Sequence, residues 1–299
     1  MNTDGHRFRG TALQACLGLS VFICGCFLGG LKAEAADPIR VVSQTVGTDE
    51  LLLAVADAEQ IAALSHLAAE TEFSAVVAEA RDFPLLTKGG DAETILKYRP
   101  THVLVADYSR ADLVAQLERA GIVVMKFTKY HTLDDAFENL RWLAEVLGPE
   151  AEARAERVIA DTQARSRALA TRLDGVRLVK VIAPSTYGVI GGAGTTFQDL
   201  CDHAGGENLA STVGGLTGHE PTPRESMLTW PVEKVVVAGK DRAMALEPYA
   251  RLAPYQFMAA VKDGRVALIE PWMMSTVSHH RVAAYEQLAR ELHPEVFAK

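Results

Sequence analysis

Tyrosine and histidine side chains directly follow several β-like runs of this sequence. Tyr108 follows one run, Tyr130 and His131 follow the next, and His279 and His280 begin the last helical run. Aromatic rings offer flat contact to a large planar or caged molecule, and a neutral imidazole or a tyrosinate can ligate iron or cobalt. For each residue taken singly, packing or surface use is the favoured interpretation, because His and Tyr are commonly intermediate in burial. Together, these residue types could serve the capture of a ring-bearing or metal-containing ligand.

One glycine-rich stretch suggests an enzyme instead. The residues Gly191–Phe197 follow a predicted strand and open a helix, as a dinucleotide-binding loop does. However, Phe197 takes the place of the third glycine, and no acidic residue follows at the distance that a ribose site requires. The sequence also contains no G-x-S-x-G, H-E-x-x-H or paired-cysteine motif. We therefore expect no enzymatic activity, and a secreted enzyme stays the less favoured alternative.

The elements that must position these residues alternate between strand and helix in the first half of the chain. The predicted strands are Arg40–Thr45, Ile61–Leu64, His102–Ala106 and Ile122–Phe127, and the predicted helices are Asp49–Ala56, Asp91–Tyr98, Arg110–Ala120 and Leu133–Leu147. Val and Ile dominate the strands with little polar alternation, as expected when both faces of a sheet are covered. This repetition predicts an α/β fold with a parallel-type sheet.

The second half repeats the pattern and predicts a second α/β lobe. Its predicted strands are Leu178–Ala183, Lys234–Ala238 and Val266–Ile269, and its predicted helices are Thr195–His203, Arg224–Thr229 and Val277–Leu292. Between the halves, apolar residues recur at steps of three and four from Ala151 to Leu173, which predicts one amphipathic helix of about six turns. This helix is either a surface helix of a single domain or a stiff bridge between two lobes. We favour the bridge, with little relative motion of the lobes and a ligand cleft between them.

The N-terminus has the three parts of a secretory signal peptide. A basic start at His6, Arg7 and Arg9 precedes the apolar run Ala12–Leu31 and the small-x-small site Ala33–Ala35. We therefore expect export to the periplasm. A membrane anchor is disfavoured because glycines dilute the run, and lipidation at Cys26 is the other alternative. The predicted organisation is a signal peptide at 1–35, an N-terminal lobe at 36–148, a bridging helix at 149–174 and a C-terminal lobe at 175–299.

Charge and cysteine content narrow the possible partners. The 299 residues carry a net charge of −8, and cleavage after residue 35 removes three basic and two acidic residues, which leaves about −9. Such an acidic protein is poorly suited to nucleic acid or an anionic membrane surface. Only Cys201 remains after cleavage, so the mature chain has no intramolecular disulfide. Cys201 follows Phe197 and Leu200 at helical spacing, which indicates that it is a small buried hydrophobic residue. We expect a monomer.

Five segments together resemble the helical-backbone periplasmic binding proteins for cobalamin, ferric siderophores and heme. They are Arg40–Ser43 with Thr48–Leu52, then Asp91–Val105, the long helix, Gly194–Leu209 and Pro223–Met227. The resemblance extends from about Ile39 to the end of the chain and rests on the order and spacing of all five. It implies the substrate-binding protein of an ABC importer, which delivers an iron complex or a cobalamin-type chelate to a permease and its ATPase. A free zinc or manganese ion-binding protein on the same backbone and a ligand sensor are the alternatives.

The resemblance also implies roles for individual residues. Glu93 and Glu225, each at the start of a short helix in a different lobe, match the two glutamates that dock the family onto permease arginines. Stabilisation of the helix start alone is the other interpretation. The residues that the resemblance and the strand ends assign to the cleft are His66, Tyr108, Tyr187, His219, Trp272 and His280, with His219 as the candidate axial ligand of a chelated metal.

Two departures from the family pattern leave the identity of the chelate open. Ser43 is not followed by the usual proline, and Thr87–Gly90 lacks the tyrosine that heme-binding relatives often carry before the first docking glutamate. Apart from the captured chelate, we expect no cofactor.

Overall fold

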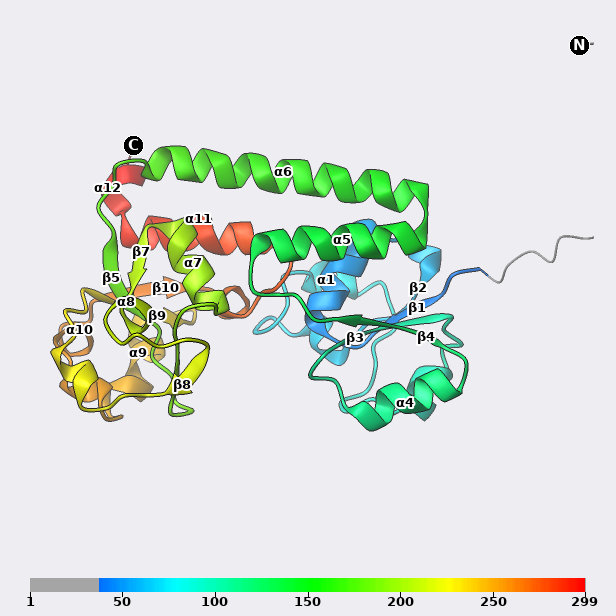
Figure 1. Ribbon diagram of the computed structural model, residues 1–299, viewed down its shortest axis with the longest axis horizontal. Helices are drawn as coiled ribbons and strands as arrows, with labels where there is room; N and C mark the ends of the chain where they lie inside the picture. The colour runs from blue at the N-terminus through cyan, green and yellow to red at the C-terminus, as the bar shows by residue number, and fades with distance from the viewer. Residues whose placement is uncertain (1–37, 299) are drawn as a thin grey trace, which may run out of the picture. The chain divides into compact units, whose positions relative to one another are not determined.

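The computed structural model describes residues 38–298, so the predicted signal peptide and Cys26 lie outside the described residues. Two four-stranded parallel sheets follow one another along the chain, and the long helix α6 (Pro149–Leu173) separates them in sequence. The predicted α/β architecture of two lobes joined by one long helix is therefore confirmed (Figure 1). No helix in the range 38–298 has the length and hydropathy needed to cross a membrane.

The N-terminal lobe contains the first sheet, whose strand order is β2-β1-β3-β4. Its strands are β1 (Val41–Ser43), β2 (Ile61–Ala63), β3 (His102–Ala106) and β4 (Val123–Phe127), and its helices are α1 (Val46–Val55), α2 (Val77–Ala80), α3 (Ala92–Leu96), α4 (Ala111–Arg119) and α5 (Leu133–Leu147). Every pairing is parallel, so each connection returns to the starting edge of the sheet, mostly through a helix. All the strands therefore end at the same edge.

The C-terminal lobe contains the second sheet, whose strand order is β10-β9-β5-β7. Its strands are β5 (Val179–Ile182), β7 (Gly206–Asn208), β9 (Lys234–Ala238) and β10 (Val266–Ile269), and its helices are α7 (Thr196–Ala204), α8 (Leu209–Thr212), α9 (Arg242–Ala250), α10 (Ala259–Lys262), α11 (Arg281–Leu292) and α12 (Pro294–Phe297). A separate antiparallel pair, β6 (Val189–Gly191) with β8 (His219–Pro221), extends from this lobe.

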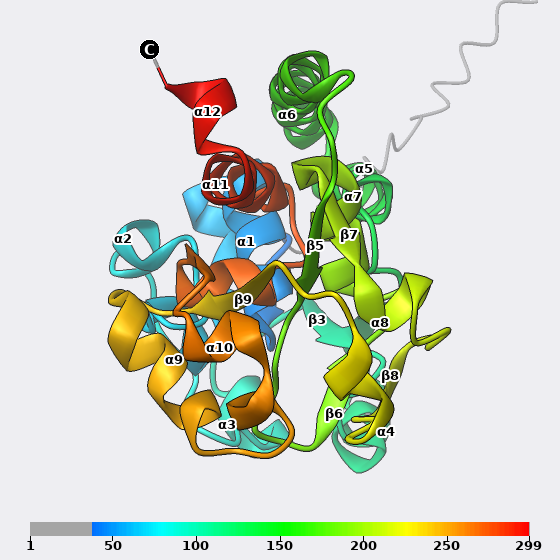
Figure 2. The ribbon, with the colours of Figure 1, turned by 90° about the vertical axis from the view of Figure 1, so that its left-hand side faces the viewer.

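The bridging helix α6 joins the two lobes through one continuous core. It has 25 residues, which corresponds to a length of roughly 37 Å. Ala151, Ala155, Ile159 and Leu169 on its buried face belong to a cluster that also holds strand and helix residues of both lobes. Figure 1 shows α6 lying along α5 and α11, and Figure 2 shows it nearly end-on.

The glycine-rich stretch after β6 serves packing in this fold. A Cβ atom added at Gly192 would collide with the carbonyl oxygen of Leu216, and the backbone amide of Ala193 donates to that same oxygen at 2.8 Å. The glycine therefore permits two backbones to approach closely. This contact explains the stretch without a phosphate-binding loop. Cys201, in the helix that follows, is fully buried as predicted.

Candidate ligand-binding site

A cavity of about 370 Å³ lies where β1, β3 and β4 end. The N-terminal lobe contributes Thr45, Gly47, Thr48, Leu51, Ala106, Tyr108, Phe127, Lys129, Tyr130 and Asn139 to its wall, and the rest of the wall comes from Thr196, His219, Met274, Ser275 and Val277. Open α/β sheets commonly bind ligands beyond the carboxyl ends of their strands, and clefts between lobes are common binding sites. We call this cavity the cleft cavity.

Two tyrosines contribute aromatic rings to the cleft cavity. The ring of Tyr108 is edge-on to the ring of Tyr130, with 6.3 Å between centroids, and Tyr108 is 69% exposed. The Tyr130 hydroxyl donates to Oδ1 of Asp107 at 2.9 Å. Burial, and then this hydrogen bond to a carboxylate, raises the pKa of Tyr130. Tyr130 therefore acts as a neutral phenol at physiological pH, with its ring available for contact.

His219 reaches the cleft cavity from the C-terminal lobe. It begins β8 and pairs with Gly191 of β6, so the small β6–β8 sheet carries its imidazole. The side chain is exposed. The cleft cavity thus has two tyrosine rings among its N-terminal-lobe residues and one imidazole among its C-terminal-lobe residues. A planar or caged ligand could lie on the rings while the imidazole nitrogen coordinates a metal atom at its centre.

A second cavity of about 280 Å³ adjoins the first and shares Thr45 and Tyr108 with it. His66 and Arg110 also line this second cavity. Its lining is mostly apolar, and Tyr108 borders both cavities. Three of the six predicted ligand residues therefore line these adjoining cavities: His66, Tyr108 and His219.

The other three predicted ligand residues lie outside both cavities. Tyr187 is 91% exposed in the turn before β6. The indole nitrogen of Trp272 donates to Oε2 of Glu270 at 3.1 Å, and its ring is edge-on to His280 at 6.4 Å. A ligand larger than the cleft cavity would have to extend beyond its walls to reach them.

The neighbouring His279 is partly exposed. Burial lowers the pKa of this imidazole to about 3, and its Nδ1 atom has no hydrogen-bond partner. Its ring lies 4.1 Å from the ring of His280. The two adjacent rings are tilted by 37° to one another, and His279 stays uncharged.

The two glutamates with a predicted docking role are both exposed. Glu93 lies in the first turn of α3 and forms an ion pair with Lys97 at 3.2 Å, in which both side chains are largely solvated. Glu225 directly precedes the short 3₁₀ turn η3 (Ser226–Thr229) where the sequence predicts a helix. Both carboxylates can be reached by a partner.

Sequence reasoning missed a set of buried charges close to the cleft cavity. Glu50 of α1 is 1% exposed, and its Oε2 accepts from the hydroxyls of Thr276 at 3.2 Å and Ser278 at 2.6 Å. Burial raises the pKa of Glu50. These bonds tie α1 to the segment before α11, which we call the crossover turn (274–280). They also explain why α11 begins at Arg281 and not at the predicted Val277.

Within residues 38–298, no group of three or more His, Cys, Asp or Glu side chains is arranged to hold a metal ion. Among the described residues that line the cleft cavity, His219 supplies the imidazole.

The fold and the cavity define a two-lobed binding protein, and comparison with known proteins gives its family. Residues 41–271 match the model of the periplasmic binding protein family. The chain belongs to this family. No curated protein sequence matches it.

Several solved structures share the fold. The periplasmic heme-binding protein RhuT from Roseiflexus sp. RS-1 in its apo form superposes with a TM-score of 0.73 at 18% identity, covering 87% of this chain and 99% of that one. A periplasmic heme-binding protein from Pseudomonas aeruginosa gives a TM-score of 0.71 at 20% identity, covering 86% of this chain and 93% of that one. CeuE from Helicobacter pylori, solved as a nickel–histidine complex, gives a TM-score of 0.68 at 16% identity, covering 86% of this chain and 84% of that one.

Proposed function

We propose that this chain is the extracytoplasmic substrate-binding protein of an ABC importer and that it captures an iron or cobalt chelate. The observation that carries the proposal is the cleft cavity of about 370 Å³, with Tyr108 and Tyr130 from one lobe and His219 from the other. Family membership supports the role in binding. Two of the structurally similar proteins are heme-binding proteins, which makes heme the first chelate to test here.

The side chains of the cleft cavity suit a large ring system better than a small polar solute. Stacked or edge-on aromatic contacts contribute about 0.5–1.5 kcal/mol each beyond the area they bury. The exposed ring of Tyr108 can turn toward a ligand, whereas Tyr130 is held through its hydroxyl by Asp107. An imidazole that ligates the chelated metal would then fix the orientation of the ring.

Delivery requires export and a membrane partner. The signal-peptide pattern at 1–35 supports a periplasmic location, and the exposed Glu93 and Glu225 offer one carboxylate on each lobe for a basic permease surface. Charge complementarity of this kind sets orientation and association rate. We propose that the permease and its ATPase are the protein partners.

An absorption titration tests the proposed ligand. Mature protein is mixed in turn with hemin, cyanocobalamin and ferric siderophores, and the mass of the intact complex is measured. We expect a one-to-one coloured complex with one of them. His219→Ala should shift the absorption bands of a bound hemin and weaken its affinity by at least about tenfold, because an axial bond is lost.

His102→Ala is the matched control, since His102 lies at the opposite end of β3 from the cavity. It should leave both the bands and the affinity unchanged. If the parent binds none of the chelates and the mass spectrum shows one stoichiometric zinc or manganese ion, the free-ion alternative replaces the proposal.

A further inference from the structure

One buried guanidinium uses all of its hydrogen-bond donors at the boundary of the two lobes. Arg281, the first residue of α11, is 1% exposed. Its Nε and Nη2 donate to the Thr276 carbonyl at 3.2 and 3.1 Å, its Nη2 also to the Tyr130 carbonyl at 3.1 Å, and its Nη1 to the His131 carbonyl at 2.5 Å and to Oδ2 of Asp199 at 3.0 Å. An arginine has five N–H donors, so none is left over.

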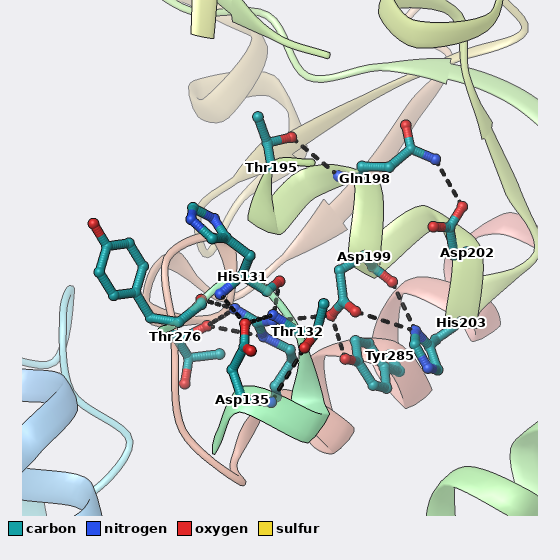
Figure 3. Close-up of polar contacts among 12 residues, drawn as sticks. His131, Thr132, Asp135, Thr195, Gln198, Asp199, Asp202, His203, Thr276 and Tyr285 are labelled. Atoms are coloured by element: carbon teal, nitrogen blue, oxygen red, sulfur yellow. Dashed lines mark hydrogen bonds and ion pairs between the residues drawn. The ribbon is translucent and has the colours of Figure 1, made fainter. Parts of the chain in front are cut away.

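The negative partner of Arg281 is itself held rigidly. Asp199 of α7 also accepts a hydrogen bond from the Tyr285 hydroxyl. The ring of His203 stacks in parallel on Tyr285 at 4.3 Å, and its Nδ1 lies 2.9 Å from the Asp199 carbonyl oxygen. Figure 3 shows these contacts converging on Asp199. A buried guanidinium that lost this carboxylate would be an uncompensated charge, so the arrangement has little freedom to shift.

The carbonyls that Arg281 binds belong to two different walls of the cleft cavity. Tyr130 and His131 lie between β4 and α5 in the N-terminal lobe, and the ring of Tyr130 lines the cavity. Thr276 lies in the crossover turn, where its neighbours Ser275 and Val277 line the cavity. A single side chain of the C-terminal lobe thus anchors the backbone of both walls.

The crossover turn is fixed from its other side by α1. The hydroxyls of Thr276 and Ser278 donate to buried Glu50, while Ser275 and Val277 face the cavity. A Cβ atom added at Gly47 would collide with Val277, so the turn and the first turn of α1 are in direct contact. Loosening Arg281 would therefore release one side of a segment that is otherwise tightly packed.

We propose that Arg281 is a positioning residue for ligand capture: it holds Tyr130 and the crossover turn at the separation that the ligand requires. It touches no ligand itself and acts through the walls that it anchors. The part of this inference that concerns affinity rests on the proposed function, whereas the part that concerns the walls does not.

Hydrogen exchange tests the walls without any ligand. Arg281→Lys keeps the charge but supplies at most three donors in place of five. We expect amide exchange to accelerate at least tenfold in segments 129–135 and 274–280, with the sheets unchanged. Arg165→Lys is the control, because Arg165 of α6 pairs with Glu286 of α11 and lines neither the cleft cavity nor the second cavity beside it. A folded Arg281→Lys protein whose exchange in both segments equals that of the parent would overturn the proposal.

Hemin serves as the probe of affinity. If Arg281 acts through Tyr130, Arg281→Lys and Tyr130→Ala should each weaken hemin binding, and the double variant should be little weaker than Tyr130→Ala alone. Fully additive losses would show that Arg281 does not act through Tyr130. A parent that does not bind hemin would count against heme as the ligand, and the exchange measurement would still decide the role of Arg281.

A second variant keeps the test decisive if Arg281→Lys does not fold. Asp199→Asn removes the negative charge but preserves an acceptor for the guanidinium. It should accelerate exchange in the same two segments and spare the sheets. Unchanged exchange there would overturn the proposal as surely as it would in the lysine variant.

Discussion

At the scale of single residues, the buried carboxyl group of Asp49 makes the stability of the protein depend on pH. Asp49 is fully buried and accepts hydrogen bonds from the amide and the hydroxyl of Ser65. Burial raises its pKa to about 7 despite these hydrogen bonds. Between about pH 4 and pH 7 the folded state therefore holds a proton that the unfolded state has lost. Stability falls as the pH rises through this window, by of order 4 kcal/mol in total.

Asp49→Asn removes this titration and retains hydrogen-bonding capacity toward Ser65. We expect the unfolding free energy of the parent minus that of the variant to decrease by several kcal/mol between pH 4 and pH 8. Urea unfolding at several pH values measures this difference, in which titrations common to both proteins cancel. Asp82→Asn, at an exposed aspartate, is the control for the substitution itself. A difference for Asp49→Asn that does not change with pH would contradict the raised pKa of Asp49.

The sequence identified exposed site residues better than buried ones. Tyr108 and His219 follow from residue type, strand ends and family resemblance, and both line the cleft cavity. Asp49 and Glu50 look in the sequence like ordinary acidic residues in the first turn of a helix, where the dipole favours them. Their burial depends on Ser65 and on the crossover turn, which are distant in sequence. No local pattern records such a contact.

At the scale of elements, α6 carries the packing that joins the lobes. Ile159 is 2% exposed on its inner face and belongs to the core cluster shared by both lobes. Replacing it with alanine removes three buried carbon atoms, and such truncations cost about 2–5 kcal/mol. Because the core is continuous, we expect Ile159→Ala to lower the stability of both lobes together in a single unfolding transition.

Thermal unfolding monitored by circular dichroism and by tryptophan fluorescence measures this effect. Trp142 lies in the N-terminal lobe, and Trp230 and Trp272 lie in the C-terminal lobe. Arg157→Ala, on the exposed face of α6, should change the midpoint little. Two separated transitions in Ile159→Ala would show that the lobes unfold independently and that α6 only links them.

The long elements of this fold could be predicted, and the short ones could not. Strands β3, β9 and β10 and helix α5 have the predicted bounds, because apolar runs and helical periodicity extend over the whole element. The β6–β8 pair consists of three-residue strands that depend on each other and on the close approach at Gly192. The predicted helix before Trp230 is a 3₁₀ turn, since four residues are too few for periodicity to distinguish the two.

At the scale of the whole molecule, the proposed function depends on presenting a loaded cleft to a membrane partner. Glu93 and Glu225 lie far apart in the sequence, one in each lobe, and both are solvent-exposed. Their exposure suits docking on arginines and does little for the fold, because an exposed pair such as Glu93 with Lys97 contributes at most about 1 kcal/mol. We therefore expect their removal to affect transport and to leave ligand binding intact.

The double variant Glu93→Ala/Glu225→Ala tests this docking role. Uptake of the captured chelate by cells that depend on this protein should fall at least about tenfold, because the charge pairs that orient the complex are lost. Affinity of the purified protein for the same chelate should stay within about twofold, since neither residue lines the cleft cavity. Glu118→Ala/Glu247→Ala removes one exposed glutamate from each lobe as a matched control and should leave uptake unchanged. Normal uptake in the Glu93/Glu225 variant would rule out docking through these two carboxylates, whereas a parallel loss of affinity would indicate that they act on the ligand and not on the permease.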